Sequence, residues 1–440
     1  MKRIRIMILL IPVLCLATVI ERDTLRNGLV ALTVEARRIP VIEMRAYVRA
    51  GSVYDPAGRE GLANIVAEML LRGTQNRSAQ EVVESIESVG GMLSAFCDED
   101  YIGLSGKVLN KDLALLVDLL AECLRRPSFE TAEFERLKSE VVSGIRAKAD
   151  DPVAISTREF RRLVFQDHRL AHLPEGHDTT VAMLTASDVR EFYSRKILPD
   201  NTFLVFIGDF TRDSLLKLLG GRFGDWERKE VLAIEPERPQ PVSQAVGRIV
   251  PMKISQAYIT LGHVGPGYGA PDWFAARLMN YMLGSRSRSY IWDRVREEKG
   301  LAYDAYSYFK RFHWGGYFAA EVQTKKEMAT EAVVTVLGAI RQVQDSLRAA
   351  DVARARNFYT GYFPLTIDSY SKMADLVSQV EIEGLGLNYI DRFEDYVGQV
   401  SLEQAAAAAR EYLCPDRYCL LIVGDLQPED IAIDSIEWLE

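Results

Sequence analysis

The second half of the chain repeats the first. Three sets of matching residues occur in the same order in both halves, and their separation grows slowly along the chain, from 211 to 213 to 216 positions. Chance matches would not keep order and spacing over about 200 residues, and such a period is far too long for a solenoid repeat. The pairs that begin the three sets are Ala46 with Ala257, Ala63 with Ala276, and Pro199 with Pro415. The sequence therefore predicts two homologous domains.

A proline-rich segment separates the two repeats. Residues 226–247 contain three prolines and show no sustained hydrophobic period, which is typical of a linker. We therefore predict an N-terminal domain over 18–225 and a C-terminal domain over 248–440.

Each repeat mixes helical and extended patterns. Val41–Arg49 alternates as a half-buried strand does, and Phe203–Ile207 is a short apolar run typical of a buried strand. Apolar residues recur at helical spacing in Gly61–Arg72, Gln80–Val89 and Asp112–Arg125. Because strands and helices do not alternate strictly, we expect an α+β fold in which each domain is a sheet with helices on one face.

The N-terminus has the pattern of a secretory signal peptide. Lys2, Arg3 and Arg5 precede an uncharged apolar run over residues 6–20, which is shorter than the ~20 residues that cross a bilayer. We predict a signal peptide over 1–17 and an exported, periplasmic or extracellular protein, with an uncleaved membrane anchor as the alternative. The net charge of −9 argues against a nucleic-acid partner, because phosphate contacts need a basic face.

Segments from both halves carry a family resemblance. The stretches 51–54, 61–74, 150–152 and 296–303 resemble the pitrilysin/insulinase family of zinc metallopeptidases, whose signature is the inverted zinc motif HxxEH on a helix. The resemblance covers essentially the whole mature chain. It implies two duplicated α+β domains arranged as a clam shell, which agrees with the internal repeat.

The zinc motif is changed at every position that carries chemistry. The resemblance places Asn64 and Glu68 at the two histidine positions, Ala67 at that of the catalytic glutamate and Gly144 at that of the distal glutamate ligand. A zinc peptidase needs three good protein ligands and a base for the bound water. These four residues do not supply them, so we predict that this chain alone binds no metal and cleaves no peptide.

The C-terminal half retains residues that the family uses on its substrates. The resemblance implies that an arginine and a tyrosine in a segment like RExxGLAY bind the substrate near the zinc; here they are Arg296 and Tyr303, with Gly300 as the turn between them. A guanidinium and a phenol are donors that hold a peptide carbonyl or its developing oxyanion. The alternative is structural, with Arg296 in a surface ion pair and Tyr303 in the core.

The family includes heterodimers in which one subunit carries HxxEH and the other contributes the Arg/Tyr pair. The resemblance therefore implies a noncatalytic subunit of a heteromeric zinc peptidase that acts on peptides or unfolded segments. An HxxEH homologue would be its heterodimer partner and would hold the zinc. Two alternatives remain: a scaffold protein with no role in catalysis, and an enzyme with a relocated metal site formed by His168, His172 and His177.

Overall fold

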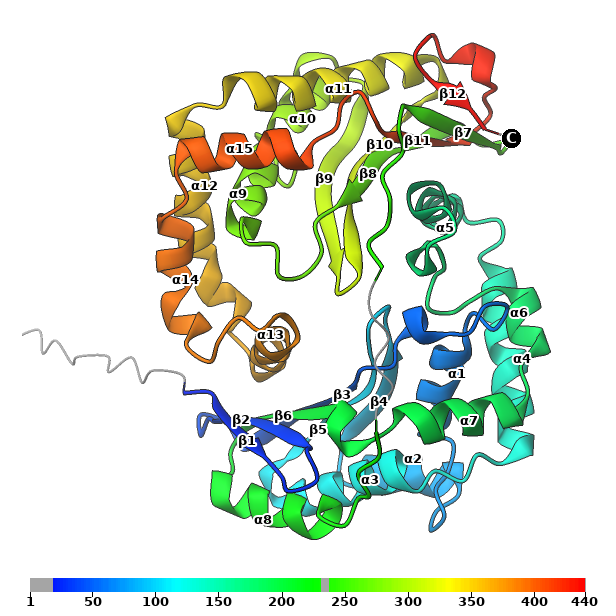
Figure 1. The fold of residues 1–440 in the computed structure, drawn as a ribbon, viewed down its shortest axis with the longest axis vertical. Helices are drawn as coiled ribbons and strands as arrows, with labels where there is room; N and C mark the ends of the chain where they lie inside the picture. Colours follow the sequence, from blue (N-terminus) through cyan, green and yellow to red (C-terminus); the bar gives the residue numbers. More distant parts are fainter. Residues whose placement is uncertain (1–18, 231–236, 440) are drawn as a thin grey trace, which may run out of the picture.

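Two six-stranded sheets organise the computed structural model, which describes residues 19–230 and 237–439 (Figure 1). The strand order is β1-β2-β6-β3-β5-β4 in the first sheet and β12-β7-β11-β8-β10-β9 in the second. The strands of the first sheet are β1 (Glu21–Thr24), β2 (Val30–Glu35), β3 (Val41–Val48), β4 (Met92–Cys97), β5 (Ile102–Leu109) and β6 (Thr202–Gly208). Those of the second are β7 (Val246–Pro251), β8 (Gln256–Gly265), β9 (Ala302–Phe312), β10 (Gly315–Lys325), β11 (Cys419–Gly424) and β12 (Glu437–Trp438).

The pairing directions repeat between the sheets except at one edge, where β1 is antiparallel to β2 and β12 is parallel to β7. β2 is parallel to β6, as β7 is to β11, and each sheet continues through three antiparallel pairs to an edge strand, β4 or β9. The predicted duplication and the α+β class with two homologous sheet-plus-helices domains are therefore confirmed. The predicted signal peptide over 1–17 lies outside the described residues. Within the described part of the chain, no helix is long and apolar enough to span a bilayer.

Helices connect the strands in both halves. The helices of the N-terminal half are α1 (Leu62–Met69), α2 (Ala79–Glu87), α3 (Leu113–Arg125), α4 (Thr131–Ala147), α5 (Pro152–Phe165), α6 (Asp178–Met183), α7 (Ala186–Lys196) and α8 (Arg212–Phe223). Those of the C-terminal half are α9 (Trp273–Leu283), α10 (Tyr290–Trp292), α11 (Ala329–Ser346), α12 (Ala349–Tyr362), α13 (Tyr370–Glu383), α14 (Tyr389–Gly398) and α15 (Leu402–Tyr412). Short 3₁₀ turns are η1 (Ser52–Tyr54), η2 (Asn110–Asp112), η3 (Arg169–Ala171), η4 (Pro199–Asn201), η6 (Lys326–Met328), η7 (Phe363–Thr366) and η8 (Pro428–Asp430), whereas η5 (Asp293–Glu298) is a π-helix.

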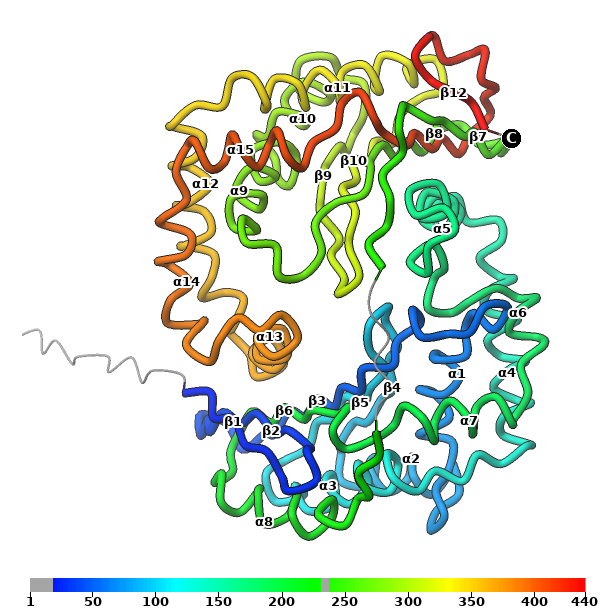
Figure 2. Tube along the Cα trace, viewed as in Figure 1, coloured from blue at the N-terminus to red at the C-terminus, as the bar shows by residue number. Residues whose placement is uncertain are grey.

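The two halves exchange a helix. α5 leaves the N-terminal half and packs on β8 and β11 of the second sheet, while α13 leaves the C-terminal half and packs on β3 and β6 of the first (Figures 1 and 2). The expectation of helices on one face only was therefore wrong. All seven residues of β6 and all six of β11 are buried, which requires cover on both faces.

Close contacts fix the exchanged helices. A Cβ at Gly262 of β8 would lie 2.8 Å from the Phe160 ring of α5. The glycine therefore lets α5 pack close to the sheet. On the other sheet, the Arg45 guanidinium donates to Asp375 and Ser371 of α13 at 3.0 and 2.7 Å. Each half therefore completes its hydrophobic core only with a helix from the other.

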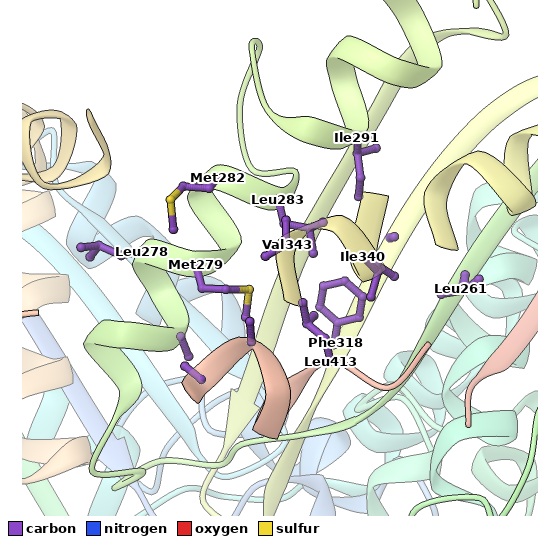
Figure 3. Packing of buried hydrophobic residues seen from close by; sticks show 14 of the residues in the cluster. Leu261, Leu278, Met279, Met282, Leu283, Ile291, Phe318, Ile340, Val343 and Leu413 are labelled. Atoms are coloured by element: carbon purple, nitrogen blue, oxygen red, sulfur yellow. The ribbon is translucent and has the colours of Figure 1, made fainter. Parts of the chain in front are cut away.

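The core of the C-terminal half supports the segment that carries Arg296. Figure 3 shows Met279 and Leu283 of α9, Phe318 of β10 and Ile340 of α11 packed together, with Ile291 of α10 close above them. Ile291 is fully buried, as is Val295 in the π-helix that follows it. These two side chains anchor α10 and η5, and so set the position of the loop between α9 and β9.

Candidate functional site

α1 carries the predicted motif positions on a helix that is fixed at its start. The buried Asp55 carboxylate accepts hydrogen bonds from the backbone N–H groups of Gly61 and Ala63, both at 2.8 Å. Burial raises the pKa of Asp55 to about 8. Gly61 adopts φ 99°, a left-handed conformation that favours glycine. The first turn of α1 is therefore held by a buried cap.

The four motif positions lie on two helices that pack against each other. Asn64 and Glu68 are half-buried on α1, and Ala67, between them in sequence, is buried. Gly144 is on α4, which contacts α1, and a Cβ at Gly144 would meet no atom within 4 Å. The space for a longer side chain at Gly144 is therefore present, but the ligand is not.

An ion pair lies beside these positions. Arg72, one turn after Glu68 on the chain, binds the carboxylate of Glu140 on α4 at 2.7 Å. Burial raises the pKa of Glu68, Arg72 lowers it, and the charge of Glu140 raises it. The Arg72 guanidinium already pairs with Glu140 and its charge acts on Glu68, so a metal cation at this place would have to compete with a positive charge. The residues present do not fit a zinc ion.

The three histidines of the relocated-site hypothesis do not converge. Both ring nitrogens of His168 are used by backbone groups, since Nδ1 accepts from the Leu170 N–H at 3.1 Å and Nε2 lies 2.9 Å from the Glu237 carbonyl. His172 and His177 contact each other, with Nδ1 and Nε2 3.1 Å apart. Among the described residues, no group of three or more His, Cys, Asp and Glu side chains could hold a metal. The hypothesis is wrong, because spacing in the loop does not fix the direction of each side chain.

Arg296 and Tyr303 do come together. The Arg296 guanidinium lies over the Tyr303 ring at 4.7 Å from its centroid, and Gly300 turns the chain between them with φ 61°. Tyr303 is 83% exposed. A core role for this tyrosine is therefore excluded. The Arg296 side chain is 32% exposed and its Nε lies 3.8 Å from the Glu297 carboxylate, so the surface ion pair expected in the structural alternative is present beside the contact with Tyr303.

Trp292 is a third member of this group that the sequence analysis missed. The Arg296 guanidinium lies 4.3 Å from the centroid of the Trp292 ring, so it has an aromatic contact with Trp292 as well as with Tyr303. The Trp292 indole N–H donates to Glu297 at 3.2 Å. The spacing of four residues between Trp292 and Arg296 places both on one helical face and was the available signal.

Comparisons with known proteins place the chain in a family. A family model described as "Insulinase (Peptidase family M16)" matches residues 31–173, and a second, described as "Peptidase M16 inactive domain", matches residues 183–359. The chain belongs to peptidase family M16. A relative described as "Uncharacterized zinc protease YmxG" of Bacillus subtilis is 24% identical over 92% of this chain and 98% of its own length.

Two solved structures have the same fold. A crystal structure titled as a peptidase M16 inactive domain from Pseudomonas fluorescens superposes with a TM-score of 0.86 at 21% identity, over 96% of this chain and 100% of that one. A protease from Helicobacter pylori gives a TM-score of 0.85 at 18% identity, over 92% and 99% of the two chains. The fold is therefore the two-domain clam shell of M16, as the resemblance implied.

The wild-type M16 chain should hold no stoichiometric zinc after dialysis, whereas a triple variant should gain it. Changing Asn64 and Glu68 to histidine and Gly144 to glutamate restores three ligands on packed helices, and we expect about one zinc per chain by metal analysis. The same variant with glutamine at position 144 is the matched control and should bind zinc more weakly. One tightly held zinc in the wild-type chain would contradict the prediction, as would a triple variant with none.

Proposed function

We propose that this M16 chain is the noncatalytic, substrate-binding subunit of a heteromeric zinc metallopeptidase. One observation carries the proposal: the zinc-motif positions lack a full set of ligands, while Arg296 lies over the ring of Tyr303, whose side chain is exposed to solvent. The exposed Tyr303 ring and hydroxyl are accessible to a peptide that approaches Arg296. The peptidase partner would be an HxxEH homologue that supplies zinc and the general base.

The chemistry of the pair fits a peptide. The Arg296 guanidinium presents several N–H donors in one plane, and the Tyr303 hydroxyl adds another. Together they would hold the carbonyl of the scissile bond and favour the negative charge that develops on its oxygen. The aromatic contacts of Arg296 with Trp292 and Tyr303 hold the guanidinium in place before the substrate arrives. The substrates would be peptides or unfolded protein segments.

The site of action would be outside the cytoplasm. The basis is the Lys2–Arg5 charge cluster followed by the apolar run, which has the pattern of a signal peptide. The mature chain would then meet its partner in the periplasm or in the medium, and it would remain attached to the membrane if the segment is not cleaved.

The proposal is tested by reconstitution. An HxxEH homologue of similar length, encoded next to this chain, should form a complex with it, and only the complex should cleave a fluorogenic peptide at full rate. A chelator should abolish that activity and added zinc should restore it. If the homologue is equally active alone, the completing role is wrong. Co-elution without any gain in activity would leave a scaffold role instead.

A further inference from the structure

A basic pocket lies apart from the Arg296 group, between the end of α4, the exposed side of α5 and the start of α6. Its volume is about 330 Å³, which is at the lower end of the ~300–1,000 Å³ range of small-molecule sites. Four cationic side chains and two carboxylates line it, in a chain whose net charge is −9. The cations are Arg146, Lys148, Arg158 and Arg162, and the acids are Glu175 and Asp178.

Two arginines from α5 form one wall. Arg158 and Arg162 are one helical turn apart, and both donate to the carboxylate of Glu159, at 3.0 and 3.1 Å. One carboxylate cannot neutralise two guanidinium groups, so this wall keeps a positive charge. Arginine presents paired N–H groups that match the oxygens of phosphate and carboxylate groups.

Two further cations that line the pocket are paired with its two acids. Arg146 pairs with Asp178 at 3.0 Å and Lys148 pairs with Glu175 at 3.2 Å, and both cationic side chains are largely exposed. Exposed pairs of this kind contribute only ~0–1 kcal/mol. A bound anion can therefore replace Asp178 and Glu175 as the partner of Arg146 and Lys148, because breaking these two exposed ion pairs costs little free energy.

His177 lies against Arg162, one of the arginines that line the pocket. A terminal nitrogen of Arg162 lies 3.3 and 3.2 Å from the two ring nitrogens, so the guanidinium covers the imidazole. Burial lowers the pKa of His177, and the charges of Arg162 and His172 lower it further. An anion bound beside Arg162 would offset that charge and raise the pKa of His177.

We infer that this pocket binds a small oxyanionic ligand, carrying either a phosphate group or the carboxylates of a polycarboxylic acid. The cavity, the excess of cationic side chains on its walls and the adjacent arginine forks carry the inference. The site is independent of the peptide-binding role proposed for Arg296. It lies on α5, the helix that the N-terminal half contributes to the second sheet, so occupancy would tie the ends of α4 and α6 to that helix.

Calorimetry on the full chain tests the inference, with inorganic phosphate and citrate as separate probes at constant ionic strength set by sodium chloride. We expect saturable binding of one of them with a stoichiometry near one. Arg158→Gln and Arg162→Gln should weaken it by about tenfold or more, because each removes a charged donor pair. Lys148→Gln changes a side chain that is 59% exposed and whose ion pair contributes only ~0–1 kcal/mol, and it should weaken binding by a smaller factor.

Arg195→Gln on α7 is the matched control, because this exposed arginine pairs with Glu191 outside the pocket. Its affinity should equal that of the wild type. By NMR, the pKa of His177 should rise when the bound probe saturates the chain, and the pKa of His313 should not. The inference would be overturned if neither probe showed saturable binding. It would also be overturned if Arg195→Gln lost as much affinity as Arg162→Gln, or if the pKa of His177 did not change on binding.

Discussion

Changing Arg296 to alanine should lower kcat of the reconstituted complex about 10²–10³-fold, the usual effect of losing a donor to a developing oxyanion, equivalent to about 2.7–4 kcal/mol. Arg296→Lys should be nearly as damaging, because an ammonium group reproduces neither the planar fork nor the aromatic contacts with Trp292 and Tyr303. Tyr303→Phe removes the hydroxyl alone. Since Tyr303 is 83% exposed, that variant should keep the wild-type melting temperature. The measurements are kcat/KM, Tm and co-elution of the pair.

Arg392→Ala is the matched control for this series. Arg392 lies over the Tyr396 ring at 4.9 Å on α14, so the variant removes a similar arginine–aromatic contact elsewhere in the same half. It should leave turnover unchanged. Wild-type turnover in both Arg296→Ala and Tyr303→Phe would end the active-site role and leave the scaffold alternative. Loss of co-elution in Arg296→Ala would instead place this residue in the subunit interface.

Changing Arg161 to methionine should destabilise the chain by about 3–5 kcal/mol, the largest stability effect that we expect from one substitution. Arg161 and Glu99 form an ion pair whose side chains are 4% and 7% exposed, and Arg161 also donates to the Leu170 carbonyl at 3.0 and 2.6 Å. Without Arg161, the Glu99 carboxylate stays buried with no opposite charge. A fall in Tm of about 3–5 °C should follow, because the unfolding entropy of a 440-residue chain is about 0.9 kcal/mol/K.

The double variant Arg161→Met/Glu99→Gln separates pairing from packing. Removing both charges should recover part of the loss, because no uncompensated charge is left in the interior. Arg195→Met is again the control, since the Arg195–Glu191 pair is 68% and 55% exposed and such pairs contribute ~0–1 kcal/mol. If Arg161→Met and Arg195→Met had the same Tm, the expected contribution of the buried Arg161–Glu99 pair to the free energy of unfolding would be wrong.

Much of the fold follows from local patterns that the sequence displays. Val41–Arg49 was predicted as a strand and is β3 (Val41–Val48), and Gly61–Arg72 contains α1 (Leu62–Met69). The apolar run Phe203–Ile207 lies inside β6, which is buried along its whole length. Such periodicities are local, so one sequence suffices to find them.

The helix exchange could not be predicted in the same way. The unbroken apolar run in β6 indicates that both faces are covered, but no local pattern tells that the second cover is α13, which begins at Tyr370. The π-helical hydrogen bonding of Asp293–Glu298 is equally invisible in the sequence, although the four-residue spacing of Trp292 and Arg296 was a signal that both side chains share one helical face. The roles of Arg296 and Tyr303 on substrate stay predictions, whereas their contact is now a property of the fold.

The exchanged helices impose an order on biosynthesis. The first sheet is complete in sequence when β6 ends at Gly208, yet the helix that covers its second face begins only at Tyr370. Roughly 160 residues must still be synthesised at ~5–20 residues per second before α13 is available. The apolar face of the first sheet therefore stays uncovered for on the order of ten seconds. During this interval the nascent chain exposes surface that invites aggregation or chaperone binding. The N-terminal half thus cannot finish folding before α13 of the C-terminal half has been synthesised, whereas α5 is already present when the second sheet is made.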